Sequence, residues 1–208
     1  MIKAIIFDFD GTLFHTNKLG RRLLKKMLKE KNIPFDEKKY KSLPHYNMQD
    51  KLKLIFPLNH KEIFAEWNKM FAVEFVKQVK PYKTVLRTIK LLHKQKIKLV
   101  IFSTKFSHHM VNALKRFKLE DCFCCIIGRE NEPAKPSPVL VKALLKKLKI
   151  DSSEVFYVGD SQLDELTANN AGLRFVLIDY GENHESINKP YARIHTISEL
   201  VKLLESEK

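Results

Sequence analysis

The chain has 208 residues, of which 44% are hydrophobic and 30% charged, a composition that suits a folded core and excludes a disordered chain. Its apolar runs are strand-sized and broken by Lys or Asp, so none reaches the roughly 20 residues of a membrane-spanning helix. The formal net charge is +14, and residues 15–80 contribute most of it, with 16 Lys or Arg against 7 acids.

This positive charge does not by itself identify a partner. No aromatic-interleaved basic motif, zinc finger or helix-turn-helix signature accompanies it, and lysines spread over helix faces usually form a solvated surface. Attraction of an anionic substrate is the second interpretation and nucleic-acid binding the third. We therefore expect neither a nucleic-acid nor a membrane partner, and the oligomeric state is left open.

Two further features concern the cellular compartment. The first apolar run ends in acids rather than in small residues, unlike a signal peptide, so a cytoplasmic location is expected. Three cysteines, Cys122, Cys124 and Cys125, cluster in one expected strand without CxxC spacing. This pattern favours buried, reduced thiols over a disulfide or a zinc site.

In chain order, the first expected element is a strand over residues 2–7, apolar without strict alternation, as in a strand covered on both faces. Residues 15–80 show only helical patterns, in a basic helix that ends near residues 31–32 and in helices over residues 49–55 and 62–79. We expect this segment to be a separate, all-helical domain.

From residue 81 onward, helical and strand patterns alternate. Strands are expected over residues 97–102, 123–127, 155–158 and 174–178, and helices over residues 84–95, 107–117 and 197–204. Ser107 and Ser137 are expected to cap helices, the second with Pro138 in its first turn. The alternation predicts an α/β fold, a doubly wound, mostly parallel sheet built from residues 1–14 and 81–208.

The most informative string is Asp8-Phe9-Asp10-Gly11-Thr12-Leu13-Phe14, directly after the first strand. Asp8 and Asp10 begin on one face of that strand because alternate residues share a side, and Gly11 lets the backbone turn away. Two carboxylates so placed suit divalent-metal phosphoryl chemistry. Taken alone, they could equally be two solvated acids.

Three more strings follow the expected strands. Ser103-Thr104-Lys105 comes after residues 97–102, where a hydroxyl and turn amides can donate to a phosphoryl oxygen, although a turn-forming Ser is the usual interpretation. Lys135 stands in Ala134-Lys135-Pro136-Ser137-Pro138, where a lone lysine would ordinarily be a surface residue. Asp160 and Asp164 follow residues 155–158, with helix capping by Asp160 as the alternative.

Together and in this order, the four strings resemble motifs I to IV of the haloacid dehalogenase-like (HAD) superfamily, and most nearly its phosphoglycolate phosphatase-like branch. The resemblance implies a Rossmann-type core with a small all-helical cap, residues 15–80, inserted after the first strand. It also implies a Mg²⁺-dependent phosphomonoester hydrolase that acts on a small phosphorylated metabolite through an aspartyl-phosphate intermediate.

The resemblance also implies roles for individual residues. Asp8 would be the nucleophile and Asp10 the general acid/base. The phosphoryl oxygens would be held by Ser103, Thr104 and Lys135. Mg²⁺ would be held by the Asp8 carboxylate, the Asp10 main-chain carbonyl and Asp160, with Asp164 as a direct or indirect ligand.

Departures and alternatives leave the substrate open. His15 stands where many family members have Asp, and Ser103-Thr104-Lys105 replaces a common Thr-Asn-Lys. A sugar-phosphate mutase, a hydrolytic dehalogenase and a non-catalytic phosphate- or nucleic-acid-binding module remain alternatives, although Asp10 argues against the dehalogenase, which has no alcohol to protonate.

Substrate selection is expected to depend on the cap that the resemblance implies. The candidates are Lys18, Arg21, Arg22 and the loop over residues 42–47 with His45 and Tyr46, each more often a surface or structural residue. His108 and His109 are expected to begin a solvated helix, although one of them could line the entrance to the site.

Overall fold

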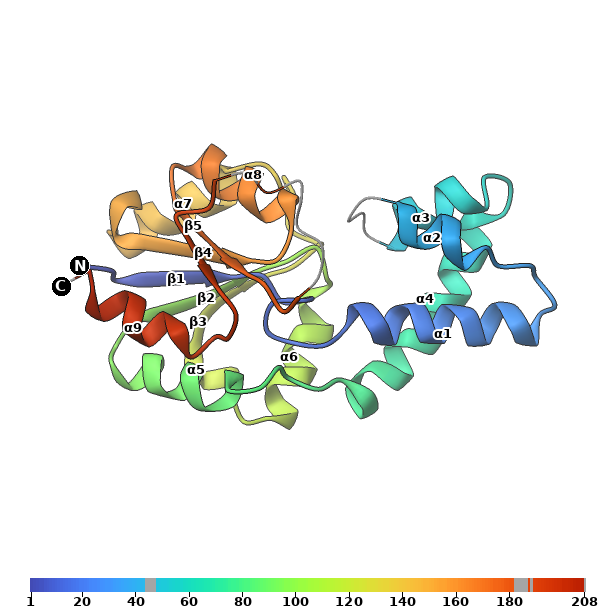
Figure 1. Cartoon of the computed structure of the whole chain (residues 1–208), viewed down its shortest axis with the longest axis horizontal. Coiled ribbons are helices and arrows are strands. Elements are labelled where there is room, and N and C mark those ends of the chain that lie inside the picture. The colour runs from blue at the N-terminus through green and yellow to red at the C-terminus, as the bar shows by residue number, and fades with distance from the viewer. Residues whose placement is uncertain (44–47, 182–186, 188, 208) are drawn as a thin grey trace. The chain divides into compact units, whose positions relative to one another are not determined.

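The computed structural model describes residues 1–43, 48–181, 187 and 189–207 (Figure 1). The chain divides into two compact units, one made of residues 1–15 and 81–208 and the other of residues 16–80. No described helix is both long and apolar enough to cross a membrane.

The larger unit is built on a six-stranded sheet with the order β3-β2-β1-β4-β5-β6, and all its pairs are parallel. The strands are β1 (Ala4–Phe7), β2 (Lys98–Phe102), β3 (Phe123–Ile127), β4 (Val155–Gly159), β5 (Arg174–Ile178) and β6 (Ala192–Ile194). Strand order reverses between β1 and β4, and open α/β sheets place their sites outside the carboxyl ends of the strands at such a point. The predicted α/β fold is confirmed.

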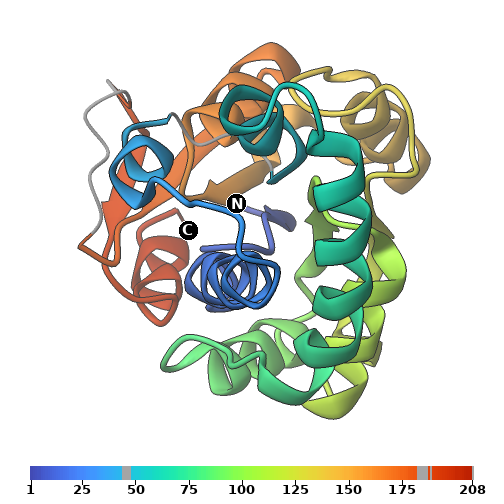
Figure 2. The same ribbon diagram turned by 90° about the vertical axis from the view of Figure 1, so that its right-hand side faces the viewer.

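Helices cover both faces of this sheet. They are α5 (Val85–Lys94), α6 (Ser107–Arg116), α7 (Val139–Leu148), α8 (Gln162–Ala171) and α9 (Glu199–Glu205), with 3₁₀ turns η1 (Glu120–Cys122) and η2 (Ser152–Glu154). Figures 1 and 2 show α7 and α8 on one face and α5 and α9 on the other. Alternate strand residues such as Ile6, Val100 and Tyr157 pack against Val141 and Leu145 of α7 in one buried cluster. Burial on both faces explains why these strands are apolar without alternation.

The smaller unit is all-helical over its described residues, with α1 (Asn17–Glu30), α2 (Glu37–Ser42), α3 (Met48–Ile55) and α4 (His60–Gln78). Aromatic rings of Trp67, Phe71 and Phe75 pack in sequence along α4, with centroids 4.7 and 5.1 Å apart. The Trp67 Nε1–H donates to the Gly20 carbonyl of α1 at 3.0 Å. A Cβ at Gly20 would lie 3.4 Å from the Trp67 ring, an ordinary van der Waals distance, so the two helices pack closely at this point.

The structure corrects two predicted helix starts. Ser107 is the first residue of α6 rather than its cap, and its hydroxyl donates to Glu130. Helix α7 begins at Val139 with Pro138 at the N-cap, so Ser137 lies one residue further out than predicted, but its Oγ still accepts from the Val139 amide at 3.4 Å. Ser107 therefore does not serve as a helix cap, whereas Ser137 keeps a capping contact with the first turn of α7.

The expectation of three buried thiols is also partly wrong. Cys122 is buried in η1, Cys125 is half-buried and Cys124 is exposed, and all three are free. β3 lies at the edge of the sheet, and its side chains are less completely buried than those of the central strand β1.

Candidate functional site

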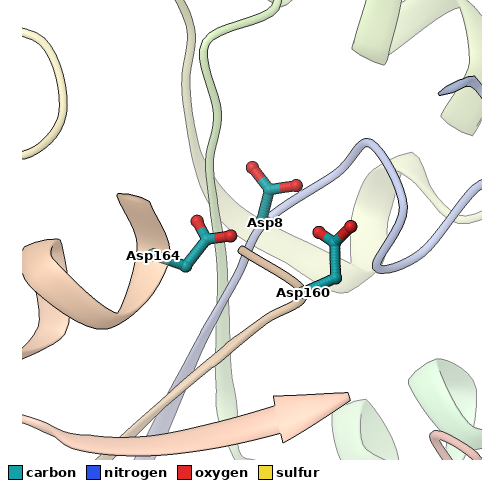
Figure 3. Close-up of side chains that lie close together, drawn as sticks. All are labelled: Asp8, Asp160 and Asp164. Atoms are coloured by element: carbon teal, nitrogen blue, oxygen red, sulfur yellow. The ribbon is translucent and has the colours of Figure 1, made fainter. Parts of the chain in front are cut away.

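Three carboxylates gather where β1 and β4 end. Asp8 follows β1, Asp160 follows β4 and Asp164 lies in the first turn of α8 (Figure 3). All three are buried, and each offers an oxygen within 4.8 Å of the others. Residues 152 positions apart in the chain meet here because β1 and β4 are hydrogen-bonded neighbours.

Lys135 provides the positive charge of this cluster. Its Nζ lies 2.8 Å from Asp8 Oδ1 and 2.6 Å from Asp164 Oδ1, and its side chain is 2% exposed. Burial opposes the charged ammonium, but the carboxylates of Asp164 and Asp8 outweigh it and raise the pKa of Lys135 well above its usual value. The lysine therefore stays charged between the two acids.

For Asp8, burial has a larger effect on the pKa than the neighbouring charge of Lys135. Burial raises the pKa of Asp8 to about 7, the charge of Lys135 opposes the rise, and Asp164 and Asp10 add to it. Several buried carboxylates that are charged at the same time repel one another. A cation bound among Asp8, Asp160 and Asp164 would relieve this repulsion.

Asp164 is held by four donors. Its Oδ1 accepts from Lys135 and from the Tyr157 hydroxyl at 3.3 Å, while its Oδ2 accepts from the Ser161 amide at 3.1 Å and hydroxyl at 2.5 Å. The bonds to Ser161 form a capping box at the start of α8. Ser161, rather than Asp160, is therefore the helix cap.

The Asp160 carboxylate is held by a residue of the motif I string, Thr12. The Thr12 hydroxyl, which is fully buried, donates to Asp160 Oδ1 at 3.1 Å. This bond joins the turn after β1 to the end of β4.

Asp10 faces a second lysine. The Lys105 Nζ lies 3.2 Å from Asp10 Oδ1 in an ion pair that lacks the angles of a hydrogen bond, and the Lys105 side chain is 10% exposed. Lys105 follows β2 by three residues, so the pair joins the ends of neighbouring strands.

Ser103 and Thr104 occupy the same turn after β2. Ser103 is buried, its amide donates to the Ile127 carbonyl at 3.0 Å, and its Oγ accepts from the Lys105 amide at 3.4 Å. The structure thus brings Asp8, Asp160, Asp164 and Lys135 into one cluster, while these two hydroxyl residues lie at the end of the adjacent strand.

Three residues of this region were not singled out from the sequence. Thr12 stands inside the motif I string, Lys105 is a charged residue directly beyond a buried strand, and Tyr157 is a hydroxyl-bearing residue within one. Each of these positions, at or near the end of an expected strand, could have indicated a site residue. The partner of each side chain, however, depends on which strands are neighbours in the sheet.

The histidines after β2 differ from each other. His109 is buried, with its ring centroid 4.1 Å from that of His108, so the expectation of a solvated pair is wrong for His109. Burial, followed by the charges of His108 and Lys105, lowers the pKa of His109 to about 4.

The proposed substrate-selecting residues lie in the helical unit. Lys18 and Arg22 of α1 are exposed, Arg21 is half-buried, and Arg22 donates to Gln78 of α4. His45 and Tyr46 lie outside the described residues.

A doubly wound α/β sheet with buried carboxylates and a lysine at its carboxyl edge defines the class of protein: an α/β enzyme with an acidic site. The chain belongs to the haloacid dehalogenase-like hydrolases, since the model of that family matches residues 5–178. The resemblance found from the four motifs is confirmed, and the chain is a hydrolase of this family.

Particular relatives carry phosphatase names. Pyrophosphatase PpaX of Halalkalibacterium halodurans is 28% identical over 209 residues, which cover 98% of this chain and 96% of that one. Phosphoglycolate phosphatase of Vibrio vulnificus is 35% identical over 104 residues, covering 50% of this chain and 46% of that one.

Solved structures are similar over nearly the whole chain. A HAD-superfamily hydrolase of subfamily IA, variant 1, from Geobacter sulfurreducens has a TM-score of 0.78 at 22% identity and covers 98% of this chain and 96% of its own. CbbY from Rhodobacter sphaeroides in complex with phosphate has a TM-score of 0.78 at 20% identity, with 96% of each chain covered. At such identities the likeness establishes the fold.

Proposed function

We propose that this protein is a Mg²⁺-dependent phosphatase that acts on a small phosphorylated metabolite through an aspartyl-phosphate on Asp8. The observation that carries the proposal is the buried lysine between two carboxylates, with Asp160 beside them. The names of the relatives, a pyrophosphatase and a phosphoglycolate phosphatase, support the same class of substrate.

The donor set suits a hard divalent cation. Mg²⁺ prefers oxygen ligands and is usually bound through one or two carboxylates, and Asp8 and Asp160 each offer a carboxylate oxygen to the acid cluster. With both Asp164 oxygens accepting from Lys135, Tyr157 and Ser161, we assign Asp164 an indirect role. When bound, Mg²⁺ would neutralise charge on the phosphoryl oxygens and on Asp8.

The reaction follows from the proposed roles. An Asp8 oxygen attacks phosphorus, the bond from phosphorus to the leaving oxygen breaks, and Asp10 gives that oxygen its proton. Asp10 then takes a proton from the water that attacks phosphorus, which releases phosphate and restores the Asp8 carboxylate. Lys135 balances the charge of the transferring group from a fixed position, and Ser103 and Thr104 donate to its oxygens.

The helical unit, residues 16–80, is proposed to be the cap that selects the leaving group. The chain enters this unit at residues 15–16, directly after the motif I string, and leaves it at residues 80–81, where Pro81 pairs with Phe14.

The test is release of inorganic phosphate from pyrophosphate, 2-phosphoglycolate, sugar phosphates and nucleoside monophosphates, with Mg²⁺ or with EDTA. We expect turnover of at least one compound with Mg²⁺ and none with EDTA. Asp8→Asn should keep the circular dichroism spectrum and lose turnover by at least about 10³-fold. Substantial phosphatase activity in that variant would contradict the proposal, and phosphate transfer between sugar hydroxyls without release would indicate the mutase.

A further inference from the structure

Tyr180 reaches the motif I turn from another strand. It follows β5 by two residues, and its hydroxyl donates to the Thr12 carbonyl at 3.0 Å. Burial, then the neighbouring Tyr82 and Asp160, raise the pKa of the Tyr180 hydroxyl, which therefore remains a protonated donor.

Thr12 connects this tyrosine to the acid cluster. Its carbonyl accepts from Tyr180 while its own hydroxyl donates to Asp160 Oδ1 at 3.1 Å. Thr12 and Asp160 are buried, so water cannot readily replace either partner. The orientation of the Asp160 carboxylate thus depends on the position of the Thr12 backbone.

The ring of Tyr180 is itself fixed. It stacks on Tyr82 with centroids 3.6 Å apart and planes 2° from parallel, and the Tyr82 ring contacts that of His15 with centroids 3.5 Å apart and planes tilted by 36°. The Tyr82 amide donates to the Leu13 carbonyl at 3.0 Å. The Tyr180 ring therefore rests on a tyrosine that is itself hydrogen-bonded to the turn containing Thr12, which fixes the hydroxyl relative to the Thr12 carbonyl.

We propose that Tyr180 is a positioning residue for the metal site, and that its hydroxyl, acting through Thr12, sets the orientation in which Asp160 meets the cation. This inference rests on the proposed Mg²⁺-dependent function. A purely structural tyrosine would contribute to stability and leave the affinity for the cation unchanged.

The test is isothermal titration of Mg²⁺ into the full-length protein, compared between the wild type and Tyr180→Phe. The substitution keeps the stacked ring and removes only the hydroxyl. We expect the Kd for Mg²⁺ to rise by about 5-fold, the change equivalent to one hydrogen bond of about 1 kcal/mol. The matched control is Tyr191→Phe, which also removes one tyrosine hydroxyl, in this case one that donates to Glu207. The Kd of this variant for Mg²⁺ should equal that of the wild type.

A double-mutant cycle tests the route through Thr12. Thr12→Val removes the bond to Asp160, so adding Tyr180→Phe should weaken Mg²⁺ binding no further, whereas Thr12→Ser should keep the full effect of Tyr180→Phe. An unchanged Kd in Tyr180→Phe, or equal effects in the Val and Ser backgrounds, would overturn this inference while leaving the proposed function intact. Absence of Mg²⁺ binding by the wild type would overturn both.

Discussion

At the scale of single residues, Lys105 offers the sharpest test of substrate class. Its ammonium lies 3.2 Å from Asp10 Oδ1, at the end of the strand next to β1, so it stands beside the proposed general acid. An anionic group on the substrate would give Lys105 another partner.

We therefore expect Lys105→Met to lower kcat/KM for pyrophosphate or 2-phosphoglycolate by about 10-fold or more, since a charge-assisted contact contributes at least about 1.5 kcal/mol. Hydrolysis of p-nitrophenyl phosphate, whose leaving group lacks that second anion, should change by less than about 3-fold. Lys115→Met is the control, because Lys115 forms an exposed pair with Glu120. Equal losses on both kinds of substrate would contradict the specificity role.

His109 makes stability depend on pH. Its pKa is lowered to about 4, below the value of about 6.5 in an unfolded chain. Between these values the unfolded state binds more protons, so the free energy of unfolding falls as pH falls from about 6.5 to 4.

His109→Gln should flatten this dependence. We expect the difference in unfolding free energy between pH 7 and pH 4.5 to shrink by about 2 kcal/mol relative to the wild type, as measured by urea denaturation. The exposed His93 gives the matched control, His93→Gln. If both variants keep the slope of the wild type, the proton uptake lies elsewhere.

The residues at the site were far more predictable than their pairings. Asp8, Asp160 and Lys135 stand at sequence positions that strand and turn patterns identify. The bond between Lys135 and Asp8, however, spans 127 positions, and that from Tyr180 to Thr12 spans 168. Such contacts depend on strand order, which local patterns leave undetermined.

At the scale of elements, Gly159 explains how α8 can begin against the end of β4. A Cβ at this position would lie 2.4 Å from the Asp164 Cβ, far inside van der Waals contact. The glycine therefore leaves room for Asp164, which completes the capping box with Ser161 and accepts from Lys135.

Gly159→Ala should force the first turn of α8 away from β4. We expect a fall in Tm larger than that of Ser161→Ala, which removes the hydroxyl of the capping box at about 1 kcal/mol. We also expect weaker Mg²⁺ binding by titration, since Asp160 and Asp164 flank the displaced turn. A Tm equal to that of the wild type would show that the turn adjusts without strain.

The buried strands followed from their patterns, whereas α2 and β6 did not. The apolar runs of β1, β2, β4 and β5 are strong strand signals because both faces of the sheet are covered. In contrast, α2 has one buried residue, Tyr40, and is fixed by Asp36, which accepts from the Lys39 amide at 2.9 Å. β6 has three residues at the sheet edge, too few for any periodicity to appear.

At the scale of the whole molecule, the net charge of +14 should act on the rate of encounter with an anionic substrate. Raising KCl from about 20 to 300 mM shortens the Debye length several-fold, so kcat/KM should fall while kcat stays nearly constant. A steady-state series at fixed Mg²⁺ measures this. Salt-sensitive binding of an oligonucleotide at low micromolar concentration would instead favour the nucleic-acid interpretation.

Metal binding should also be visible as stability of the folded chain. A ligand that binds only the folded state stabilises it by RT ln(1 + [L]/Kd), about 2.7 kcal/mol at 100 times Kd. For a protein of this size, that corresponds to a rise in Tm of about 5–10 °C. We expect this rise on adding saturating Mg²⁺ to EDTA-treated protein in differential scanning calorimetry.

Asp160→Asn separates a specific site from general screening by the salt. The substitution keeps an acceptor for the Thr12 hydroxyl and removes one charge from the acid cluster, so the variant should gain little from Mg²⁺ at the same concentration. Asp121→Asn, in the 3₁₀ turn before β3, also removes one carboxylate charge and should respond as the wild type does. An equal rise in Tm for the wild type and both variants would place Mg²⁺ away from the three carboxylates. A cation held by Asp160 loses its charged ligand in Asp160→Asn but not in Asp121→Asn.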